Sequence, residues 1–433
     1  MGKLPELLAP AGDESGIIAA IHAGADAVYF GGKKFNARQR ASNIEDQEMT
    51  HNIRLCHQNG VKAYLTLNIL IKECEWPSLL DYLSLIATTD IDGIIVQDPG
   101  LIWFLRKWCP EISLQTSTQA SIGGLYGVKF FEDMGFTRVV LPREMSMDDV
   151  VTIKNQTKVE LKIFCHGALC YARSGQCLLS SFIGGRSGNR GLCAQPCRKQ
   201  YVLKNNKGQH VAQGYLLSMK DLNTKEHLNE IVKSGVSALK IEGRLKNPEY
   251  IYAVTKAYRD QLDDIYRSPQ TEHTKHEDIM GQVFNRSFTP GHLFERSGFI
   301  NPVIQKNRGT LIGRVVSYAN RQITIQLKEG VQLSVGDGLA FGESAQKGIR
   351  VDKIKSIHGQ IVVPCHFKIE LGTSVYRNNN SKLNTFLEKK VTEPLEFKKI
   401  PMRLQLNICE NQSVFFKIFT GKKREQGDRK STR

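Results

Sequence analysis

The segment HAGADAVYFGG (residues 22–32) contains the pattern that decides the fold. A helical stretch ends at a glycine, where the left-handed backbone of a helix end favours that residue, and a short strand follows directly. The strand is apolar almost throughout, as strands of a buried parallel sheet are. The same succession returns in QNGVKAYLTLN (58–68), DIDGIIVQD (90–98), DMGFTRVVLP (133–142) and KSGVSALKIEGR (233–244).

Working outward from these segments gives eight strands, with helical stretches between most of them. Eight alternating units are typical of a (β/α)8 barrel of the TIM type. An open doubly wound sheet is the alternative, but its G-x-G-x-x-G fingerprint does not occur here. We therefore predict the α/β class, with a TIM-like barrel over residues 1–265. The expected strands are 6–11, 26–32, 62–68, 93–98, 112–118, 138–142, 160–167 and 238–244.

The last third of the chain changes its period. From about residue 308, apolar and polar residues alternate, as in GRVVSYANRQITIQL (313–327). This alternation predicts a small antiparallel β-barrel over residues 306–380, which a linker or extension at 266–305 joins to the first barrel. Residues 400–420 form one more alternating hairpin, and a lone hairpin needs partners. We interpret residues 381–433 as the truncated start of a further domain with a basic tail.

The composition is that of a globular and strongly basic protein. The 433 residues are 41% apolar and 24% charged, with a formal net charge of +16. This charge favours nucleic acid or another anionic surface as partner, although a halo of solvated lysines would give the same total. No apolar run reaches the roughly 18 residues of a membrane span, and MGKLPELLAPAGDE at the start lacks a signal-peptide core. We therefore expect a cytoplasmic protein, in which ten cysteines do not form a disulfide framework.

Four cysteines lie close together in the interval between the seventh and eighth strands. The segment reads FCHGALCYARSGQCLLSSFIGGRSGNRGLCAQPCR (164–198), within a Cys-rich insertion at 165–200. Uneven spacings suit an iron–sulfur cluster that is reached from an irregular loop, whereas zinc sites usually show two tight CxxC-like pairs. A zinc site and a loop without metal remain alternatives. Cys165 is a fifth thiol nearby, and we interpret it as a buried core residue and not as a ligand. The four cysteines are Cys170, Cys177, Cys193 and Cys197, with six, fifteen and three intervening residues.

The surroundings of these cysteines are cationic. From Leu161 to Lys220 the chain has no Asp or Glu but nine Lys or Arg. Between the cysteine pairs lies GGRSGNRG (184–191), in which backbone N–H groups and the side chains of Arg186 and Arg190 suit a phosphate or carboxylate. A loop shaped only to wrap the cluster is the alternative interpretation.

Polar residues follow most of the predicted strands. In a barrel these strand ends line one mouth, where the catalytic residues of TIM barrels lie. We predict that Glu242, Arg244, His166 and Asp221 are catalytic, with Glu or His transferring protons, and that arginines bind a small anionic ligand. For any single residue, a loop ion pair or a helix cap is the alternative. The anion-binding arginines would be Arg38, Arg40 and Arg143; other residues at these ends are Asn36, Asn68, Asp98, Gln115, Gln119 and Glu144.

The cysteine segment closely resembles the signature of the peptidase family U-32, the collagenase-like proteins. Two further stretches resemble the family: LLAPAGDESGIIAAIHAGADAVYFGGKKFNAR (7–38) and LLSMKDL (216–222), the latter followed by ALKIEGR (238–244). The resemblance covers about residues 4–380. It implies a (β/α)8-like barrel followed by a β-barrel.

The resemblance also implies a chemistry. The chain is similar to members that hydroxylate RNA or ubiquinone without molecular oxygen and that carry a 4Fe-4S cluster; its ligands here would be the four cysteines. Some relatives, including the ubiquinone branch, have a cysteine after the SKDL-like segment, and Asn223 at that position excludes this other ligand set. GGRSGNRG with CAQPC is most similar to the ribosomal-RNA branch. The implied activity is hydroxylation of a base in rRNA or tRNA, dependent on prephenate.

Two other functions stay open. The family label implies a peptidase, but the chain has no HExxH, no GxSxG and no convincing Cys/His dyad. A non-catalytic RNA-binding accessory protein, built around a structural cluster, would carry the same charge and the same cysteines. The expected partners are RNA and a small anionic metabolite, without a membrane.

Overall fold

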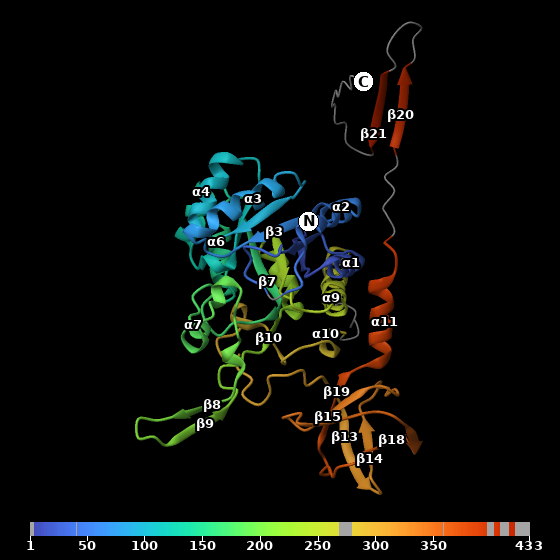
Figure 1. The fold of residues 1–433 in the computed structure, drawn as a ribbon. Coiled ribbons are helices and arrows are strands. Elements are labelled where there is room, and N and C mark those ends of the chain that lie inside the picture. Colours follow the sequence, from blue (N-terminus) through green and yellow to red (C-terminus); the bar gives the residue numbers. More distant parts are fainter. Residues whose placement is uncertain are drawn as a thin grey trace.

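The barrel that the repeated segments predict is present and closed (Figure 1). The computed structural model describes residues 4–39, 41–267, 279–357, 359–395, 402–407 and 415–420. The barrel strands are β1 (Glu6–Pro10), β2 (Ala27–Phe30), β3 (Lys62–Leu67), β4 (Gly93–Val96), β5 (Leu114–Thr116), β6 (Arg138–Val140), β7 (Glu160–Ala168) and β11 (Ala238–Ile241). All run parallel in chain order, and β11 pairs with both β1 and β7. This closure confirms the TIM-like barrel and excludes the open doubly wound sheet.

Helices cover the outside of the barrel, and the local sequence explains where they begin and end. The Asp13 carboxylate accepts a hydrogen bond from the Gly16 N–H at 3.0 Å and so caps the first helix. Past four helix ends stand glycines with positive φ, as the repeated pattern predicts: Gly24, Gly60, Gly135 and Gly235. The helices are α1 (Glu14–His22), α2 (Met49–Gln58), α3 (Trp76–Ile86), α4 (Pro99–Trp108), α5 (Leu125–Asp133), α6 (Met147–Lys154), α8 (Leu228–Lys233) and α9 (Pro248–Arg267).

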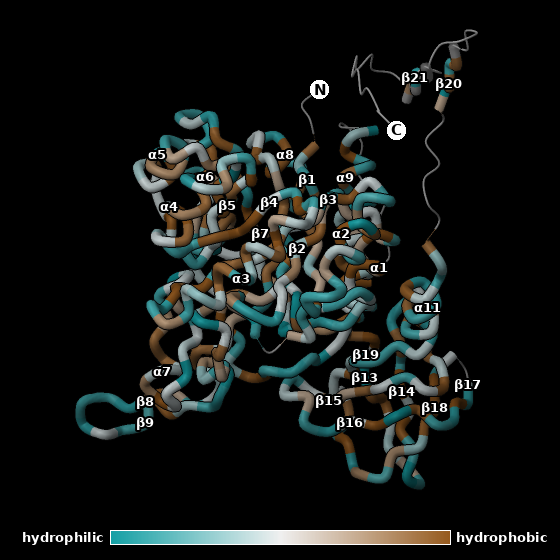
Figure 2. The backbone as a smooth tube through the Cα atoms, turned by 45° about the horizontal axis from the view of Figure 1, so that its top comes forward, coloured by the Kyte–Doolittle hydropathy of each residue, from teal (hydrophilic) through white to brown (hydrophobic). Residues whose placement is uncertain are grey.

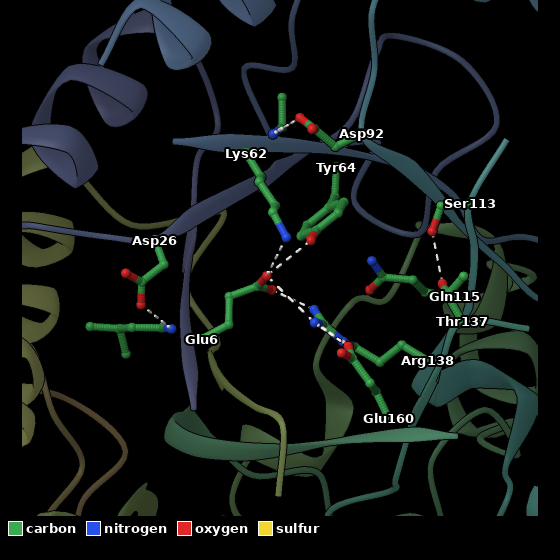
Figure 3. A network of polar contacts seen from close by, with 12 residues as sticks. Glu6, Asp26, Lys62, Tyr64, Asp92, Ser113, Gln115, Thr137, Arg138 and Glu160 are labelled. Atoms are coloured by element: carbon green, nitrogen blue, oxygen red, sulfur yellow. Dashed lines mark hydrogen bonds and ion pairs between the residues drawn. The ribbon is translucent and has the colours of Figure 1, made fainter. Parts of the chain in front are cut away.

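Charged side chains close the amino-terminal end of the barrel (Figure 3). Glu6 pairs with Arg138 and accepts a hydrogen bond from the Tyr64 hydroxyl at 3.0 Å. The Nε of Arg138 also donates to Glu160 at 2.8 Å. The exposed fraction of the Arg138 side chain is 7%, and a buried charge is tolerated only when it is paired in this way. This end is therefore occupied by structural ion pairs, and the mouth lies at the opposite end.

The insertion between β7 and β11 forms a separate layer over the mouth. It contains α7 (Leu179–Gly184), the antiparallel strands β8 (Tyr201–Lys204) and β9 (His210–Gly214), and β10 (Asp221–Asn223). β10 pairs antiparallel with the end of β7 and parallel with β12 (Phe288–Thr289), which extends the sheet beyond the barrel. The β8–β9 hairpin projects away from the body (Figure 1). The sequence pattern did not predict these strands.

The predicted antiparallel β domain is also present. Its seven-stranded sheet has the order β16-β15-β19-β13-β14-β18-β17 and forms a half-barrel around its own apolar cluster. Figures 1 and 2 show it at the same end of the barrel as the cysteine insertion. The strands are β13 (Thr310–Ala319), β14 (Gln322–Leu327), β15 (Gly338–Phe341), β16 (Lys347–Arg350), β17 (Lys355–Ile357), β18 (Gln360–Pro364) and β19 (Ser374–Asn379).

The segment after this sheet returns to the barrel. Helix α11 (Ser381–Thr392) packs against α1 and α9, with Leu387 fully buried in the main core, while α10 (Ile279–Gln282) lies between α9 and β19. The residues that we interpreted as the start of a further domain thus begin with a helix of the barrel's outer layer. β20 (Met402–Asn407) and β21 (Phe415–Thr420) pair as the expected hairpin. Among the helices that the structure describes, none combines the length and apolarity needed to cross a bilayer.

Candidate active site

Arginines from two strand ends meet one glutamate at the mouth of the barrel. Glu242 follows β11, Arg38 follows β2 and Arg143 follows β6. The Arg38 Nη2 donates to Glu242 Oε1 at 3.1 Å, and the Arg143 Nη2 donates to Glu242 Oε2 at 2.8 Å. Each carboxylate oxygen is therefore bound by a different arginine. The structure brings these three predicted residues together.

Arg244 lies beside this group and is fixed by neutral partners. Its guanidinium donates to the Thr66 hydroxyl at 3.1 Å and to Asn36 Oδ1 at 3.2 Å. Asn36 Oδ1 also accepts from the Arg38 backbone N–H at 2.8 Å, so one amide orients both arginines. A Cβ atom at Gly31 would overlap the Arg244 guanidinium and Asn36. Only glycine at position 31, at the end of β2, therefore leaves space for the side chains of Arg244 and Asn36.

The charges in this cluster do not balance. Burial raises the pKa of Glu242, but the cations around it, Arg38 and Arg143 first and then Lys240 and Arg244, together lower it to about 2. Burial and the neighbouring Arg38 lower the pKa of Arg244 to about 10. One carboxylate therefore faces three guanidinium groups. The excess of positive charge makes the mouth a site for an anionic ligand.

Lys240 is a further cation below Glu242, and our sequence analysis did not include it. Its Nζ lies 4.0 Å from the Tyr29 ring centroid and 5.4 Å from that of Phe164, and the Arg143 guanidinium covers Phe164 at 3.9 Å. Burial lowers the pKa of Lys240 to about 7, against the opposing effect of Glu242. Its amine can therefore exchange a proton near neutral pH.

Deeper in the barrel, Lys162 occupies a similar place. Its Nζ donates to Gln115 Oε1 at 2.7 Å and lies 4.9 Å from the Tyr64 ring centroid. Burial lowers the pKa of Lys162 well below its ordinary value. Gln115, which we placed at a strand end, is therefore a barrel-interior partner of this lysine. Lys240 could have been found from the sequence, because it stands two residues before Glu242 on the same strand face.

The four cysteines lie next to the arginine cluster. Burial raises the pKa of Cys170 while Arg143 lowers it, and burial likewise raises that of Cys197 while Arg198 lowers it. Cys177 and Cys193 also raise the pKa of Cys170, and all three other cysteines raise the pKa of Cys197, so the four thiols lie within electrostatic range of one another. Cys193 in turn raises the pKa of Arg38, after the larger effect of Glu242. The arginines that hold Glu242 therefore also face the cysteines.

The four cysteines form a donor set whose chemistry suits a metal centre. All described cysteines are free, and Cys193 Sγ accepts from the Gln195 backbone N–H at 3.4 Å. In the part of the chain that the structure describes, no three Cys, His, Asp or Glu side chains converge closely enough to hold one metal ion. In a 4Fe-4S cluster each thiolate binds its own iron, so the four sulfurs stand further apart than the ligands of one zinc. Four thiols, cationic neighbours and backbone donors suit such a cluster.

Contacts with three strand-end loops hold the insertion over the mouth. Glu144, after β6, accepts hydrogen bonds from the Ser174 backbone N–H at 2.9 Å and from its hydroxyl at 3.0 Å. Arg190 pairs with Glu75 and donates to the Leu70 carbonyl, both after β3. Gly191, with φ of +86°, packs against the loop that carries Arg38. Arg190 thus serves to dock the insertion and is not free for an external anion in this arrangement.

His166 and Asp221 belong to a second group, behind the first. Asp221 accepts from the Arg286 backbone N–H at 3.0 Å and from its guanidinium at 3.1 Å. The His166 ring lies among Tyr250, Tyr258 and Phe288. Burial, with a smaller effect of Lys246, lowers the pKa of His166 to about 3. The Glu242 backbone N–H donates to the His166 carbonyl at 2.9 Å, but the side chains of His166 and Asp221 contact other groups than the Glu242 carboxylate.

The remaining predicted residues divide between structural and exposed positions. Asp98 caps α4, because its carboxylate accepts from the Leu101 N–H at 2.8 Å. Asn68 orients the Arg38 loop by accepting from the Ala37 N–H at 3.0 Å. Arg186 is exposed at the end of α7. Arg40 lies outside the described residues.

The comparisons with known proteins agree with this geometry. A family model described as peptidase family U32 matches residues 12–301. The chain belongs to this family. The match confirms the resemblance that the cysteine segment and the two further stretches indicated. The matched region contains the cysteine insertion and every barrel strand except β1, which lies just before it.

Curated U32 relatives carry three kinds of name. The chain is 37% identical to the 23S rRNA 5-hydroxycytidine C2501 synthase of Escherichia coli, over 77% of the chain and 52% of that protein. It is 32% identical to tRNA hydroxylation protein P1 of Bacillus subtilis, over 78% and 83%. It is 30% identical to a collagenase of Porphyromonas gingivalis, over 82% and 90%. The chain thus spans about half of the first relative and most of the other two.

Proposed function

We propose that this U32 protein is an iron–sulfur enzyme that hydroxylates a base in ribosomal or transfer RNA. The observation that carries the proposal is the position of the cysteine insertion over the mouth, where Cys193 interacts electrostatically with Arg38 and Cys170 with Arg143. A redox cluster bound by the cysteines would then lie directly beside the anion-binding site formed by the arginines. The names of the Escherichia coli and Bacillus subtilis relatives support RNA as the substrate class.

The charge distribution supports two anionic ligands. The acid-free stretch from Leu161 to Lys220 offers a cationic surface to an RNA backbone. The excess of guanidinium groups around Glu242 would hold the carboxylates of a small metabolite, which prephenate would satisfy. We therefore propose that the metabolite binds in the mouth and that the RNA lies across the insertion.

The side chains divide the chemical work between them. A 4Fe-4S cluster, when bound by Cys170, Cys177, Cys193 and Cys197, supplies electron transfer at the mouth. Glu242 is ionised at neutral pH and bridges two arginines, so it orients them and does not act as an acid. Lys240, with an amine that titrates near neutral pH, is better placed to accept or give a proton. His166 stays neutral in its aromatic surroundings.

The cluster is tested by anaerobic purification with iron and sulfide analysis. We expect about four irons and four sulfides per chain, and loss of both in the single variants Cys170→Ser, Cys177→Ser, Cys193→Ser and Cys197→Ser. Cys74→Ser is the matched control, because Cys74 is exposed and lies outside the insertion. A colourless protein with one zinc and no sulfide would overturn the redox proposal.

The activity is tested by mass spectrometry of rRNA and tRNA from a strain that lacks the chain. One nucleoside should lose the mass of one oxygen atom. Wild-type protein should restore it, and Cys170→Ser should not. Unchanged RNA in the deletion strain would contradict the proposal.

Proteolysis is the competing function, favoured by the collagenase relative. It predicts that a cluster-free Cys170→Ala protein still cleaves collagen and that Glu242→Gln abolishes this cleavage. The RNA proposal predicts no cleavage by either protein. The two functions are therefore separated by one pair of variants.

A further inference from the structure

The hairpin formed by β8 and β9 is a projecting arm without a described structural partner for its strands. Val202 and Leu203 are neighbours in β8, and their exposed fractions are 44% and 52%; Val211 in β9 is 60% exposed. Successive strand residues point to opposite faces, so both faces of the arm are open to solvent. A two-stranded hairpin with both faces in water is marginal by itself. Both faces of the arm are therefore available as a binding surface.

The base of the arm is firmly fixed. Arg198, immediately before it, is buried and donates to the Leu169 carbonyl at 2.9 Å. The Tyr201 hydroxyl donates to the Pro196 carbonyl at 3.0 Å. At the other strand, the Tyr215 N–H donates to the Pro302 carbonyl at 2.9 Å. These contacts therefore fix the direction of the arm relative to the cysteine insertion.

The tip of the arm is ordered as well. Asn205 Oδ1 accepts from the backbone N–H groups of Lys207 and Gln209, at 3.0 Å and 2.9 Å. The Asn205 amide also donates to Gln209 Oε1 at 2.8 Å. Such a side-chain-stabilised turn presents its neighbours in a fixed geometry. Hydrogen bonds of the Asn205 side chain thus order the tip, and Figure 2 shows it as hydrophilic.

The charge of the arm selects its ligand. Residues 199–214 contain Lys199, Lys204, Lys207 and His210, all exposed, and no acidic residue. An acidic polymer complements this surface, whereas a second copy of the arm would be repelled by it. The apolar side chains between the lysines suit sugars and bases, which lie next to phosphates in a nucleic acid.

The end of α7 adds an aromatic contact beside the arm. α7 packs on Pro196–Arg198, the turn that leads into β8, and both views show it at the base of the hairpin (Figures 1 and 2). Phe182 on this helix is 85% exposed, and the exposed Arg186 follows two residues after its last turn. Exposed aromatic rings next to cationic groups are typical of surfaces that bind single-stranded nucleic acid by base stacking.

We propose that the β8–β9 arm and the end of α7 form a binding surface for single-stranded RNA. Lys204 and Lys207 contact phosphates at the tip, and Phe182 stacks on a base nearer the mouth. The choice of RNA over other nucleic acids rests on the proposed function. The surface itself rests on the geometry and charge of the insertion.

The binding test uses the full chain and a fluorescein-labelled single-stranded RNA of mixed sequence, about 20 nucleotides long, so that it exceeds a usual site size. Fluorescence anisotropy gives the Kd at several salt concentrations. We expect Lys204→Glu with Lys207→Glu to weaken binding by at least about tenfold. The slope of log Kd against log salt should fall by about 1.4, which corresponds to two phosphate contacts.

Two controls are matched to these variants. Arg54→Glu with Lys107→Glu makes the same change in net charge on the outer helices α2 and α4, where both residues are exposed. It should leave Kd and slope nearly unchanged. Phe182→Ala should weaken binding by about fivefold or more without changing the slope, whereas Tyr126→Ala, at an equally exposed aromatic residue on α5, should not. Circular dichroism and iron content verify that each variant folds.

Several outcomes would overturn the proposal. The tip variant could bind RNA with the wild-type Kd and slope, or the outer-helix variant could lose as much affinity as the tip variant. A third would identify a protein interface instead: Val202→Ser with Val211→Ser would change the oligomeric state in solution and leave RNA binding intact.

The arm and the proposed function can fail separately. If wild-type protein restores no RNA modification but its RNA binding depends on Lys204 and Lys207, the hydroxylase proposal fails and the arm stands. If the tip variant binds and modifies RNA as the wild type does, the arm alone is refuted.

Discussion

At the scale of single residues, the mouth depends on one carboxylate shared between two arginines. Glu242 binds Arg38 through one oxygen and Arg143 through the other, and both arginines also face cysteines of the insertion. Because the exposed fraction of the Glu242 side chain is only 15%, the loss of its charge leaves cations that water screens poorly. Small changes here should therefore affect both stability and chemistry.

Glu242→Gln tests this dependence. We expect the free energy of unfolding at pH 7 to fall by about 3 kcal/mol, because two largely buried guanidinium groups lose their counter-charge. The pKa of Glu242 is about 2 in the folded protein and about 4.3 in an unfolded chain. Its stabilisation is therefore complete above about pH 5 and is lost as the pH falls toward 2. Urea unfolding of wild type and Glu242→Gln between these pH values should show the difference in their free energies of unfolding shrinking as the pH falls.

The control for this variant is Glu160→Gln at the other end of the barrel. Glu160 pairs with Arg138 but is 48% exposed, so its loss should cost less than about 1 kcal/mol. A gap between wild type and Glu242→Gln that stays constant with pH would contradict the shared-carboxylate interpretation.

Lys240→Met tests the buried amine. Because burial lowers the pKa of Lys240 to about 7, the unfolded chain binds one more proton than the native protein between about pH 7 and pH 10. The free energy of unfolding should therefore rise with pH in this window for the wild type. The variant should show a rise smaller by about 2 kcal/mol between pH 7 and 9. Lys107→Met, at an exposed lysine on α4, should follow the wild-type curve.

At the scale of elements, the insertion is held on the mouth by close contacts with loops of the barrel. The Cβ that any other residue would add at Gly191 would lie 2.8 Å from the Asn36 carbonyl oxygen and 3.0 Å from the Gln39 nitrogen. These two residues flank Arg38. The position of the cysteines relative to the arginines thus depends on a backbone-to-backbone contact that only glycine permits.

Gly191→Ala should loosen the insertion. We expect a loss of about 1–3 kcal/mol from the strained backbone, together with faster proteolysis within residues 165–220 and lower iron content. Gly208→Ala is the matched control, because Gly208 also has positive φ, +77°, but has nothing within 4 Å of the added Cβ. It should retain iron. Equal iron loss in both variants would show that backbone strain alone, and not the contact with the Arg38 loop, matters.

At the scale of the whole molecule, the half-barrel domain and the TIM-like barrel are joined by a helix of the barrel's outer layer, whose Leu387 is buried in the main core. α11 follows β19 directly and packs on α1 and α9. The His22 imidazole lies 2.8 Å from the Glu393 carbonyl oxygen just after this helix, which ties it to α1. The two domains should therefore not unfold independently.

Leu387→Ala tests this coupling. Leu387 is fully buried among barrel side chains, so we expect a loss of about 2–5 kcal/mol in the stability of the barrel. Phe386→Ala, one residue earlier and 45% exposed, should cost less than about 1 kcal/mol. Differential scanning calorimetry reports both. A wild-type barrel transition in Leu387→Ala would show that α11 is only an appendage.

The barrel, the small antiparallel sheet and the grouping of the four cysteines could all be predicted from the amino-acid sequence. Each depends on local signals: period, glycine at helix ends, and spacing along one loop. It also gave the group of Glu242, Arg244, Arg38 and Arg143, because parallel strands end at the same mouth. These residues lie on different strands, yet the closed topology leaves them only one place to meet.

Which of those residues are in contact could be seen only in the folded structure. His166 lies among aromatic rings and Asp221 is paired with Arg286, because the end of β7 and β10 extend beyond the barrel as a separate sheet edge. Arg190 became a docking residue because its loop folds back on Glu75. Side-chain partners across long sequence separations are set by how layers stack, and no local pattern records that. The projecting arm was also not predicted from the sequence. Its strands are short, and they pack against no other described element whose pattern would have indicated them.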